Sequence, residues 1–435
     1  MIRIRDPLHG SITLTPAELA IVESPFLQRL RHIKQLGFTD QAFPGATHTR
    51  FAHALGALEM ATRMFDALFP LEGSPLDGPT RARFRQLVRL GLMLHDVGHP
   101  PASHAGEVAM PKRHTLALPG FTDEEQTARA THEDYTLAFI LGSPLKSLIE
   151  QHFPDDVSPL ALAHLVAGRY PKVAPLFHHR GINYFPLLTQ LVSGELDADR
   201  MDYLQRDAYF SGVTYGRFDQ GWLLENLTHH VVADQACLAL SHRAVFAFED
   251  FLLSRYHMFV SVYYHHVPVG FETMLLRFFN DEPTAFVLPS DIEAYLGVDD
   301  LTLWTTLRQS HNPWARRIAT RRPFKRILEL NADPMHPVVP AVLDALNTEG
   351  IAHFESEDRG VLSKYYGASG GPPIYVVHES IGEAVPIQRY ARVYERYAQP
   401  TRLTRVYVDP EHTARARALV GTVVGEISLA GAVFG

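Results

Sequence analysis

The chain has almost no cysteine. Cys237 is the single one among 435 residues, which excludes an intramolecular disulfide and a zinc cluster held by several thiolates. If the protein binds a metal, the ligands must therefore come from imidazole and carboxylate side chains. Histidine is plentiful for that role, with 24 residues in the chain.

Long apolar runs and excess positive charge are missing as well. No stretch of about 18 uncharged apolar residues occurs, and the N-terminal sequence MIRIRDPLHG lacks the apolar segment of a signal peptide. The formal net charge of −8 gives no general attraction to a polyanion. We therefore expect a cytoplasmic protein that has neither a membrane nor a nucleic acid as a partner.

What is present is the composition of an ordinary globular protein, with 46% hydrophobic and 20% charged residues. Helical periodicity dominates the first 290 or so residues. In TRFAHALGALEMATRMFDALF, Phe51, Leu55, Leu58 and Phe65 recur at helical spacing, and a similar pattern runs up to Leu94. These segments predict amphipathic helices.

Beyond about residue 290 the sequence changes character. PPIYVVHE and RLTRVYVD are short β-branched and aromatic runs, which are typical of strands, and an Asp409-Pro410 helix start follows the second. The sequence therefore predicts a mainly α protein, with an all-helical core over residues 1–290 and a small α+β lobe over residues 291–435 packed on it.

Ionisable residues gather in LMLHDVGHPPASHAGE, residues 92–107, which holds three histidines and two carboxylates. Pro100 and Pro101 cannot continue the preceding helix, so His99 and His104 should lie on a loop or a short turn just beyond its end. His95 and Asp96 could supply two metal ligands from that helix end, because imidazole and carboxylate suit a catalytic divalent metal.

Two other segments could complete a metal site. His53 stands in the middle of a predicted helix, where an aliphatic side chain would pack more easily. In ELDADRMDYLQRDAYF, Asp199, Tyr203 and Asp207 follow one another at i, i+4 and i+8 and so share one helical face. Taken separately, each of these residues has an ordinary explanation, as a core histidine, a solvated carboxylate or a chance motif.

Taken together, these segments resemble the HD-domain deoxynucleoside triphosphate triphosphohydrolases, in the branch of the SAM- and HD-domain dNTPase and without its SAM module. The resemblance covers roughly residues 4–330 and includes RDPLHG, FPGATHTRFAHALG, LHDVGHPPASHAGE, THEDY, DADRMDYLQRDAY and SRYHMFVSVYYHH. It implies an HD-domain core with one divalent metal per site, and the His and Asp ligands do not distinguish Mn, Fe, Mg, Co, Ni and Zn.

The resemblance also implies a role for each matched residue. The implied metal ligands are His53, His95, Asp96 and Asp199. The implied catalytic group consists of His99, His104, Glu107, His132 and Glu133. The implied substrate contacts are Gln35, Leu36, Arg50, Arg200, Tyr203, Asp207, Arg255 and Tyr263.

The chemistry of α-phosphorus cleavage agrees with these residue types. Arg50 and Arg200 would hold the triphosphate by charge-assisted hydrogen bonds, with His99 and His132 steadying the phosphates. His104, oriented by Glu107, would be the general acid for the departing 5′-oxygen. On the sugar, Asp207 and Gln35 would bind the 3′-hydroxyl. Leu36, Tyr203 and Tyr263 would close against C2′ and reject a ribose hydroxyl.

The chain departs from the family at the active site. Arg200 stands where the family has a lysine, and Tyr264 and His266 stand where its best-known member has glutamine and lysine. Arginine keeps the charge but changes the geometry of its hydrogen bonds.

The regulated members bind an activating nucleotide at an oligomer interface. Here Glu23, Gln28 and Arg31 would read its base, and Arg321 and Lys325, within RRIATRRPFKR, would hold its triphosphate. Arg5 stands where an asparagine is found. The alternative is that this basic segment is a solvated helix. We expect a nucleotide substrate and a homo-oligomer, either a dimer or a tetramer.

Two other functions stay open at this point. An HD phosphohydrolase could act on another nucleotide or phosphate monoester, and a nucleotide sensor could keep the pocket without turnover. The set of predicted ligands together with His104 and Glu107 argues against a sensor, which has no need of an acid aimed at a leaving group. A P-loop NTPase is excluded, because no GxxxxGK[ST] motif occurs.

Overall fold

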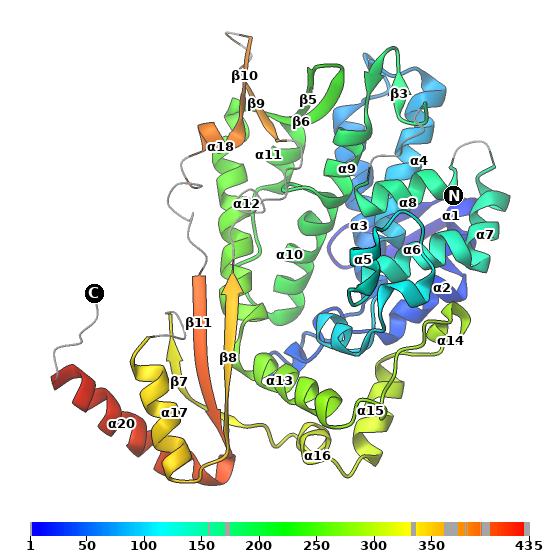
Figure 1. Cartoon of the computed structure of the whole chain (residues 1–435). Helices are drawn as coiled ribbons and strands as arrows, with labels where there is room; N and C mark the ends of the chain where they lie inside the picture. The colour runs from blue at the N-terminus through cyan, green and yellow to red at the C-terminus, as the bar shows by residue number, and fades with distance from the viewer. Residues whose placement is uncertain are drawn as a thin grey trace.

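The computed structural model describes residues 2–154, 157–169, 175–331, 336–360, 373–378, 380, 382–391, 393 and 401–429. The protein is mainly helical, as predicted, and small sheets lie at three places on the helical body (Figure 1). None of the helices in the described ranges combines the length and the apolar character needed to cross a bilayer.

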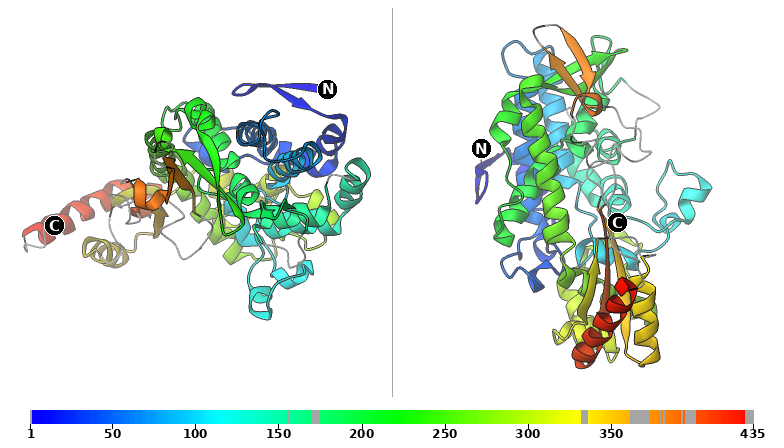
Figure 2. Two further views of the ribbon diagram at one scale, coloured as in Figure 1. Left: turned by 90° about the horizontal axis from the view of Figure 1, so that it is seen from above. Right: turned by 90° about the vertical axis from the view of Figure 1, so that its left-hand side faces the viewer.

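The chain begins with a hairpin on the outside of the body (Figure 2). Strands β1 (Ile2–Asp6) and β2 (Gly10–Leu14) pair antiparallel, with Ile2 opposite Leu14. Gly10 closes the turn with φ +76°, a backbone conformation that glycine adopts without a steric penalty. Short helices and turns follow: α1 (Pro16–Val22), α2 (Pro25–Gln28), η1 (Arg29–His32) and η2 (Thr39–Gln41).

Two long helices form the centre of the body and confirm the periodicity seen in the sequence. Helix α3 (Arg50–Leu68) buries its apolar positions, and α4 (Gly78–Leu94) starts at an Asp77 side chain that accepts a hydrogen bond from the backbone N–H of Thr80. Helix α4 ends at Leu94, and residues 95–98 form a turn. His104 lies on the short 3-10 helix η3 (Ser103–Ala109), so the predicted turn after Pro101 is confirmed.

The other helices of the body surround this pair, and α10 packs directly against α3. They are η4 (Arg113–Leu116), α5 (Asp123–Thr127), α6 (His132–Gly142), α7 (Pro144–His152), α8 (Pro159–Ala167), α9 (Phe185–Ser193), α10 (Ala198–Ser211), α11 (Gln220–Glu225), η5 (His242–Ala244), α12 (Val245–Met258), the π-helical turn η6 (Phe259–Tyr263), α13 (His266–Asp281), α14 (Ile292–Leu296), α15 (Asp300–Gln309) and α16 (Pro313–Ala319).

A six-stranded sheet lies at one end of the body, in the order β10-β9-β6-β4-β3, with β5 also paired to β6. Its strands are β3 (His178–His179), β4 (Ile182–Asn183), β5 (Leu227–Val232), β6 (Gln235–Ser241), β9 (Tyr375–His378) and β10 (Glu383–Pro386). The predicted strand in PPIYVVHE is β9, and it pairs in parallel with β6. This C-terminal segment therefore extends a sheet of the body, followed by the short helix α18 (Ile387–Tyr390).

A separate antiparallel sheet at the other end is ordered β7-β11-β8. Its strands are β7 (Lys325–Leu330), β8 (His353–Gly360) and β11 (Thr401–Val408). Helix α17 (Val338–Thr348), the short turn η8 (Pro410–His412) and helix α20 (Thr413–Leu429) complete this part of the chain, and Figure 1 shows the two helices beside the sheet. Val342, Leu346, Val406 and Val408 are buried in a small core between them.

Aromatic packing joins this C-terminal sheet to the helical body. Phe354 of β8 and Tyr407 of β11 stack on each other and belong to the same buried cluster as Phe271 of α13 and Phe324. The Tyr407 hydroxyl donates a hydrogen bond to the backbone oxygen of His266 at 2.9 Å. A division of the chain at residue 290 stays a prediction.

We predict that Gly56→Ala destabilises the protein. A Cβ at Gly56 of α3 would collide with the side chains of Asp202 and Arg206 of α10, and these form a buried ion pair that cannot move without losing hydrogen bonds. The expected loss is about 2–4 kcal/mol in the free energy of unfolding, measured by denaturant titration. Gly78→Ala is the matched control, because a Cβ there meets open space; equal unfolding midpoints for both variants would contradict the packing described.

Candidate active site

The four side chains predicted as metal ligands come together between α3, the end of α4 and the start of α10. His53 lies on α3, and its Nε2 atom is 3.4 Å from Nε2 of His95. Asp199 Oδ1 lies 3.0 Å from His53 Nε2 and 3.5 Å from His95 Nε2. Asp96 Oδ1 lies 3.3 Å from His95 Nε2. Residues separated by up to 146 positions in the sequence thus share one point in space.

Both imidazoles are oriented by hydrogen bonds on their far side. Nδ1 of His53 lies 2.8 Å from Oδ2 of the buried Asp202, and Nδ1 of His95 donates to the backbone oxygen of Leu92 at 2.6 Å. An Nδ1–H donated in this way leaves Nε2 with its lone pair free, as a metal ligand requires. The two Nε2 atoms therefore face the same point.

The charges at this point suit a divalent cation. Burial alone lowers the pKa of His53, but hydrogen bonds to Asp199 and Asp202 outweigh it and raise that pKa to about 10. Without a metal the carboxylates therefore stabilise a proton on this imidazole, and a cation bound there would take the place of the proton on Nε2. The carboxyl of Asp199 is partly buried, which raises its pKa, yet hydrogen bonds from His53 and His95 bring the pKa well below the usual range. The imidazole nitrogens of His53 and His95 and a carboxylate oxygen of Asp199 lie within 4.8 Å of one another and form a donor set that fits such an ion, with Asp96 adjacent to His95.

A network behind His53 was missed by the sequence analysis. Asp202 is fully buried and accepts hydrogen bonds from Arg206 at 2.9 Å, and its Oδ1 lies 2.6 Å from His9 Nε2. Arg206 also donates to Asp6 of β1 at 2.9 Å. The i, i+4 spacing of Asp202 and Arg206 was visible in the sequence, but nothing there linked them to His9.

A second histidine cluster surrounds Glu107. Its Oε1 atom lies 2.5 Å from His132 Nδ1 and 3.2 Å from His104 Nδ1. Burial raises the pKa of Glu107, but these hydrogen bonds outweigh it and lower the pKa to about 2. His99 stacks on His132 with ring centroids 3.8 Å apart. The side chain of His104 is 72% exposed, so its ring is accessible from the pocket while a carboxylate holds its far side.

One pocket of about 600 Å³ connects these groups. Its walls include most of the predicted site residues: Gln35, Leu36, Arg50, His95, Asp96, His99, His104, His132, Glu133, Asp199, Arg200, Tyr203, Asp207 and Tyr263. His53 is fully buried and Glu107 stands behind His104. The volume lies within the range of small-molecule sites.

The arginines of the site are held by oxygen partners. Arg50 donates through Nε to Ser103 Oγ at 2.8 Å and through Nη1 to Asp96. Arg200 donates through Nη1 to the backbone oxygen of Glu195 at 2.9 Å. Burial lowers the pKa of Arg200, but Asp197 and Glu195 outweigh it and raise the pKa. Both guanidinium groups are therefore positioned before any ligand arrives.

The residues predicted to face a sugar form a hydrogen-bonded wall of the pocket. Tyr263 donates its hydroxyl to Asp207 Oδ2 at 2.7 Å, and His48 Nε2 lies 2.8 Å from Asp207 Oδ1. The ring of Tyr203 lies 6.4 Å from that of Tyr263. Arg255 is placed one layer away from the cavity, 3.6 Å from Glu195, with its guanidinium over the ring of Phe259. His48 was missed because Asp207 is 159 positions away in the sequence, and Glu195 was missed because no pattern links it to Arg255.

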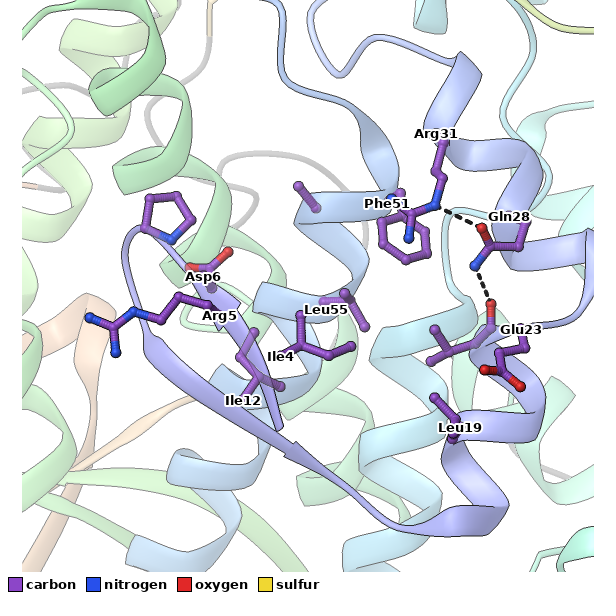
Figure 3. Close-up of a pocket in the computed structure, with 13 residues that line it drawn as sticks. Ile4, Arg5, Asp6, Ile12, Leu19, Glu23, Gln28, Arg31, Phe51 and Leu55 are labelled. Atoms are coloured by element: carbon purple, nitrogen blue, oxygen red, sulfur yellow. Dashed lines mark hydrogen bonds between the residues drawn. The ribbon is translucent and has the colours of Figure 1, made fainter. Parts of the chain in front are cut away.

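The predicted regulatory residues divide into two groups. Glu23, Gln28 and Arg31 line a separate pocket of about 660 Å³, together with the hairpin residue Arg5 (Figure 3). Arg31 lies flat over the ring of Phe51, with 3.6 Å from its guanidinium carbon to the ring centroid, and donates through Nε to Gln28 Oε1 at 2.7 Å.

Arg321 and Lys325 are not among the residues that line this second pocket within the described chain. Arg321 donates to the backbone oxygen of Gln41 at 2.9 Å, and Lys325 begins β7. A single copy of the chain therefore does not place these two cations beside Glu23.

Two family models match the chain. The model of the HD domain matches residues 50–207, which include the metal-ligand candidates and the pocket wall of α10. The model of the HD associated region matches residues 219–361, which include α12, α13 and strands β7 and β8.

Several known proteins are similar in sequence or structure. Uncharacterized protein MJ1154 of Methanocaldococcus jannaschii is 28% identical over 353 residues, which are 81% of this chain and 65% of that protein. The deoxynucleoside triphosphate triphosphohydrolase SAMHD1 of Homo sapiens is 31% identical over 221 residues, 48% of this chain and 33% of SAMHD1. The crystal structure of a hypothetical protein from Aquifex aeolicus superposes with a TM-score of 0.74 at 28% identity, covering 96% of this chain and 99% of the other. The chain spans about half the length of the curated relatives it matches.

We predict that Asp199→Ala loses bound metal and that His104→Ala retains it. Removing Asp199 takes away one ligand and one neutralising charge, and a three-ligand remainder binds weakly. His104 lies in the other cluster, held by Glu107, so its removal leaves the donor set intact. Metal content after gel filtration, measured by elemental analysis, checks both. Stoichiometric metal in Asp199→Ala would refute the ligand assignment.

Proposed function

Since this chain is an HD-domain protein homologous to the SAMHD1 triphosphohydrolases, we propose that it is a metal-dependent hydrolase that converts deoxynucleoside triphosphates to deoxynucleoside and inorganic triphosphate. One observation carries the proposal: a single pocket joins the His and Asp cluster, the exposed His104 backed by Glu107, and the wall of Tyr203, Tyr263 and Asp207. One bound ligand could therefore contact the His and Asp cluster, the proton donor His104 and the wall that recognises a sugar.

The metal would be held by His53, His95, Asp96 and Asp199. Bound there, a divalent ion supplies neutralisation of phosphoryl charge and makes water more acidic. The protein's own residues do the rest of the binding. Arg50 and Arg200 hold the triphosphate through charge-assisted hydrogen bonds, and their partners keep them from relaxing away from the pocket.

His104 donates the proton that the departing 5′-oxygen needs. Glu107 holds Nδ1 of His104 at 3.2 Å, which leaves Nε2 to carry a proton outward. The same carboxylate holds His132, whose ring stacks on His99, so both rings keep fixed positions for phosphate oxygens. This arrangement supports acid catalysis at the ester oxygen.

Tyr203 and Tyr263 close the sugar end of the pocket. The Tyr263 hydroxyl is bound to Asp207, so the ring is fixed and leaves little space for a 2′-hydroxyl. A ribonucleotide would bury an unpaired hydroxyl or displace this wall, and either costs binding free energy. A deoxyribose is therefore the expected sugar.

The product distribution tests the proposal. The expected products from each deoxynucleoside triphosphate are the deoxynucleoside and intact triphosphate, separated by ion-exchange chromatography from reactions with metal-loaded protein. His104→Ala should lower turnover by roughly 10²–10⁴-fold while the metal content stays unchanged. Orthophosphate or pyrophosphate as the main product would overturn the assignment, and hydrolysis of monophosphates alone would assign the site to phosphomonoesters.

We also propose that the pocket at Glu23 and Arg31 binds an activating nucleotide in an oligomer. The flat Arg31 over Phe51 and the nearby Glu23 carboxylate suit a purine base. In this proposal Arg321 and Lys325 come from a neighbouring subunit and hold the triphosphate.

We predict that Arg31→Ala removes activation and leaves basal turnover unchanged. The measurement is the initial rate of dATP hydrolysis with and without added GTP. The reason is that Arg31 contacts the proposed effector and lies outside the substrate pocket. Equal stimulation of the variant and the wild type would contradict the regulatory site.

A further inference from the structure

Glu272 is a carboxyl group in the substrate pocket to which the proposed chemistry assigns no role. It lies in the second turn of α13 and lines the pocket together with Asp358 of β8. Within the described ranges its carboxyl takes part in no hydrogen bond, although the side chain is partly buried. A ligand in the pocket is thus the available partner for this group.

The neighbour of Glu272, Asp358, is paired with Arg405, yet burial outweighs this pairing and raises the pKa of Asp358 to about 6, so it is mainly ionised at neutral pH. Arg405 of β11 donates through Nη1 to Asp358 Oδ2 at 2.5 Å and through Nε to Glu329 Oε2 at 2.6 Å. Burial first, and then the charge of Asp358, raise the pKa of Glu272 to about 7. The carboxyl of Glu272 therefore changes its protonation state near neutral pH.

A series of neighbouring aromatic rings extends from the His and Asp cluster to the part of the pocket that Glu272 lines. The rings of His53 and Tyr203 are 6.4 Å apart, and so are those of Tyr203 and Tyr263. Phe259 then lies 5.0 Å from Tyr263 and 5.5 Å from Tyr264. Asp358 and Glu272 both raise the pKa of Tyr264 after burial does, so they lie beside the last ring of the series.

Glu272 lies beside Tyr264 in the pocket, whereas Arg50 is bound to Asp96 next to the His and Asp cluster. Asp358 is the charged group that raises the pKa of Glu272. A triphosphate at the arginines and a sugar at Tyr263 direct the nucleobase toward Tyr264 and Glu272. A negative group at this end would repel phosphate, but it can bind the N–H groups of a base.

We propose that Glu272 hydrogen-bonds the edge of the substrate's nucleobase, and that its protonation state sets which base is preferred. This inference rests on the proposed dNTP hydrolysis and adds the residue that distinguishes the bases. The ionised carboxylate offers two acceptors, which match N1–H and N2–H of guanine. The protonated carboxyl offers one donor and one acceptor, which match the ring nitrogen and amino group of adenine.

Other groups around Glu272 shape its titration. The charged and titratable groups of the surrounding elements are Asp358 and Glu357 on β8, Arg405 and Tyr407 on β11, Arg326 and Glu329 on β7, Tyr264 and His265 just before α13, His266 at its start, and Arg255 on α12. Burial and nearby arginines lower the pKa of His266 to about 4, so it stays neutral while Glu272 titrates.

The test is the ratio of kcat/KM for dGTP to that for dATP between pH 6 and pH 8.5. Because both substrates use the same metal and the same acid, titration of the catalytic groups cancels in this ratio. We expect the ratio for dGTP over dATP to rise roughly tenfold as the pH increases. The reason is that the ionised carboxylate of Glu272 pairs with guanine, whereas its protonated form pairs with adenine. A second measurement needs no turnover. The dissociation constants of dGTP and dATP are measured with the His104→Ala variant over the same pH range, and their ratio is compared in the same way.

Two variants separate base recognition from a structural role. In Glu272→Gln the amide offers one donor and one acceptor and does not titrate. The dGTP-to-dATP ratio of kcat/KM for this variant should therefore be independent of pH and equal to the wild-type ratio at pH 6. Glu355→Gln changes an exposed carboxyl of β8 outside the pocket and should keep the wild-type pH dependence. A flat wild-type ratio with deoxynucleoside and triphosphate as products would overturn the inference and leave the proposed function standing. If the protein hydrolyses no dNTP and the ratio of the two dissociation constants does not change with pH, the inference and the proposed function are both overturned.

Discussion

The carboxylate of Asp202 is the group on which the other parts of the site depend. It is fully buried, and an unpaired charge at such a position would destabilise the fold by about 3–5 kcal/mol. Arg206 neutralises it with two hydrogen bonds, and His9 and His53 supply two more contacts. The N-terminal hairpin region, α3 and α10 are thereby held to one another. The same carboxylate orients His53 so that Nε2 faces His95 and Asp199, where the proposed metal would bind.

The pocket has two chemically different parts. Arg50 and Arg200 lie in one part, together with His95, Asp96 and Asp199, and Arg50 is held there by Ser103 and by Asp96. Carboxyl groups occupy the other end, where Asp358 is held by Arg405. In the proposed function, the anionic phosphates of the nucleotide would meet the arginines, and the N–H groups of its base would meet the carboxyl groups. Strand β8, far along the chain from His53 and His95, thus supplies Asp358 to the wall of the same pocket.

Much of the local structure could be predicted, because its causes are local. Helices α3 and α4 follow from apolar spacing, and α4 has to end near Pro100 because proline cannot continue a helix. The strand character of β9 and β11 follows from β-branched and aromatic runs. The strands with which β9 and β11 pair could not be predicted, because the pairing of a strand depends on which sheet edge is free once the helical body has folded. β9 therefore joined β6, whereas β11 joined β7 and β8.

The sequence by itself determined which residue types form the His and Asp cluster and which helices carry them. A histidine in the middle of a helix and an HD pair at a helix end are visible as patterns. Only the tertiary structure decided their supports, because a buried charge takes its partner from whatever element packs against it. His9 and Asp202 are 193 positions apart, and Arg405 lies 47 positions from Asp358. No periodicity connects such pairs; they are paired because an ionised group buried between packed elements is stable only beside an opposite charge.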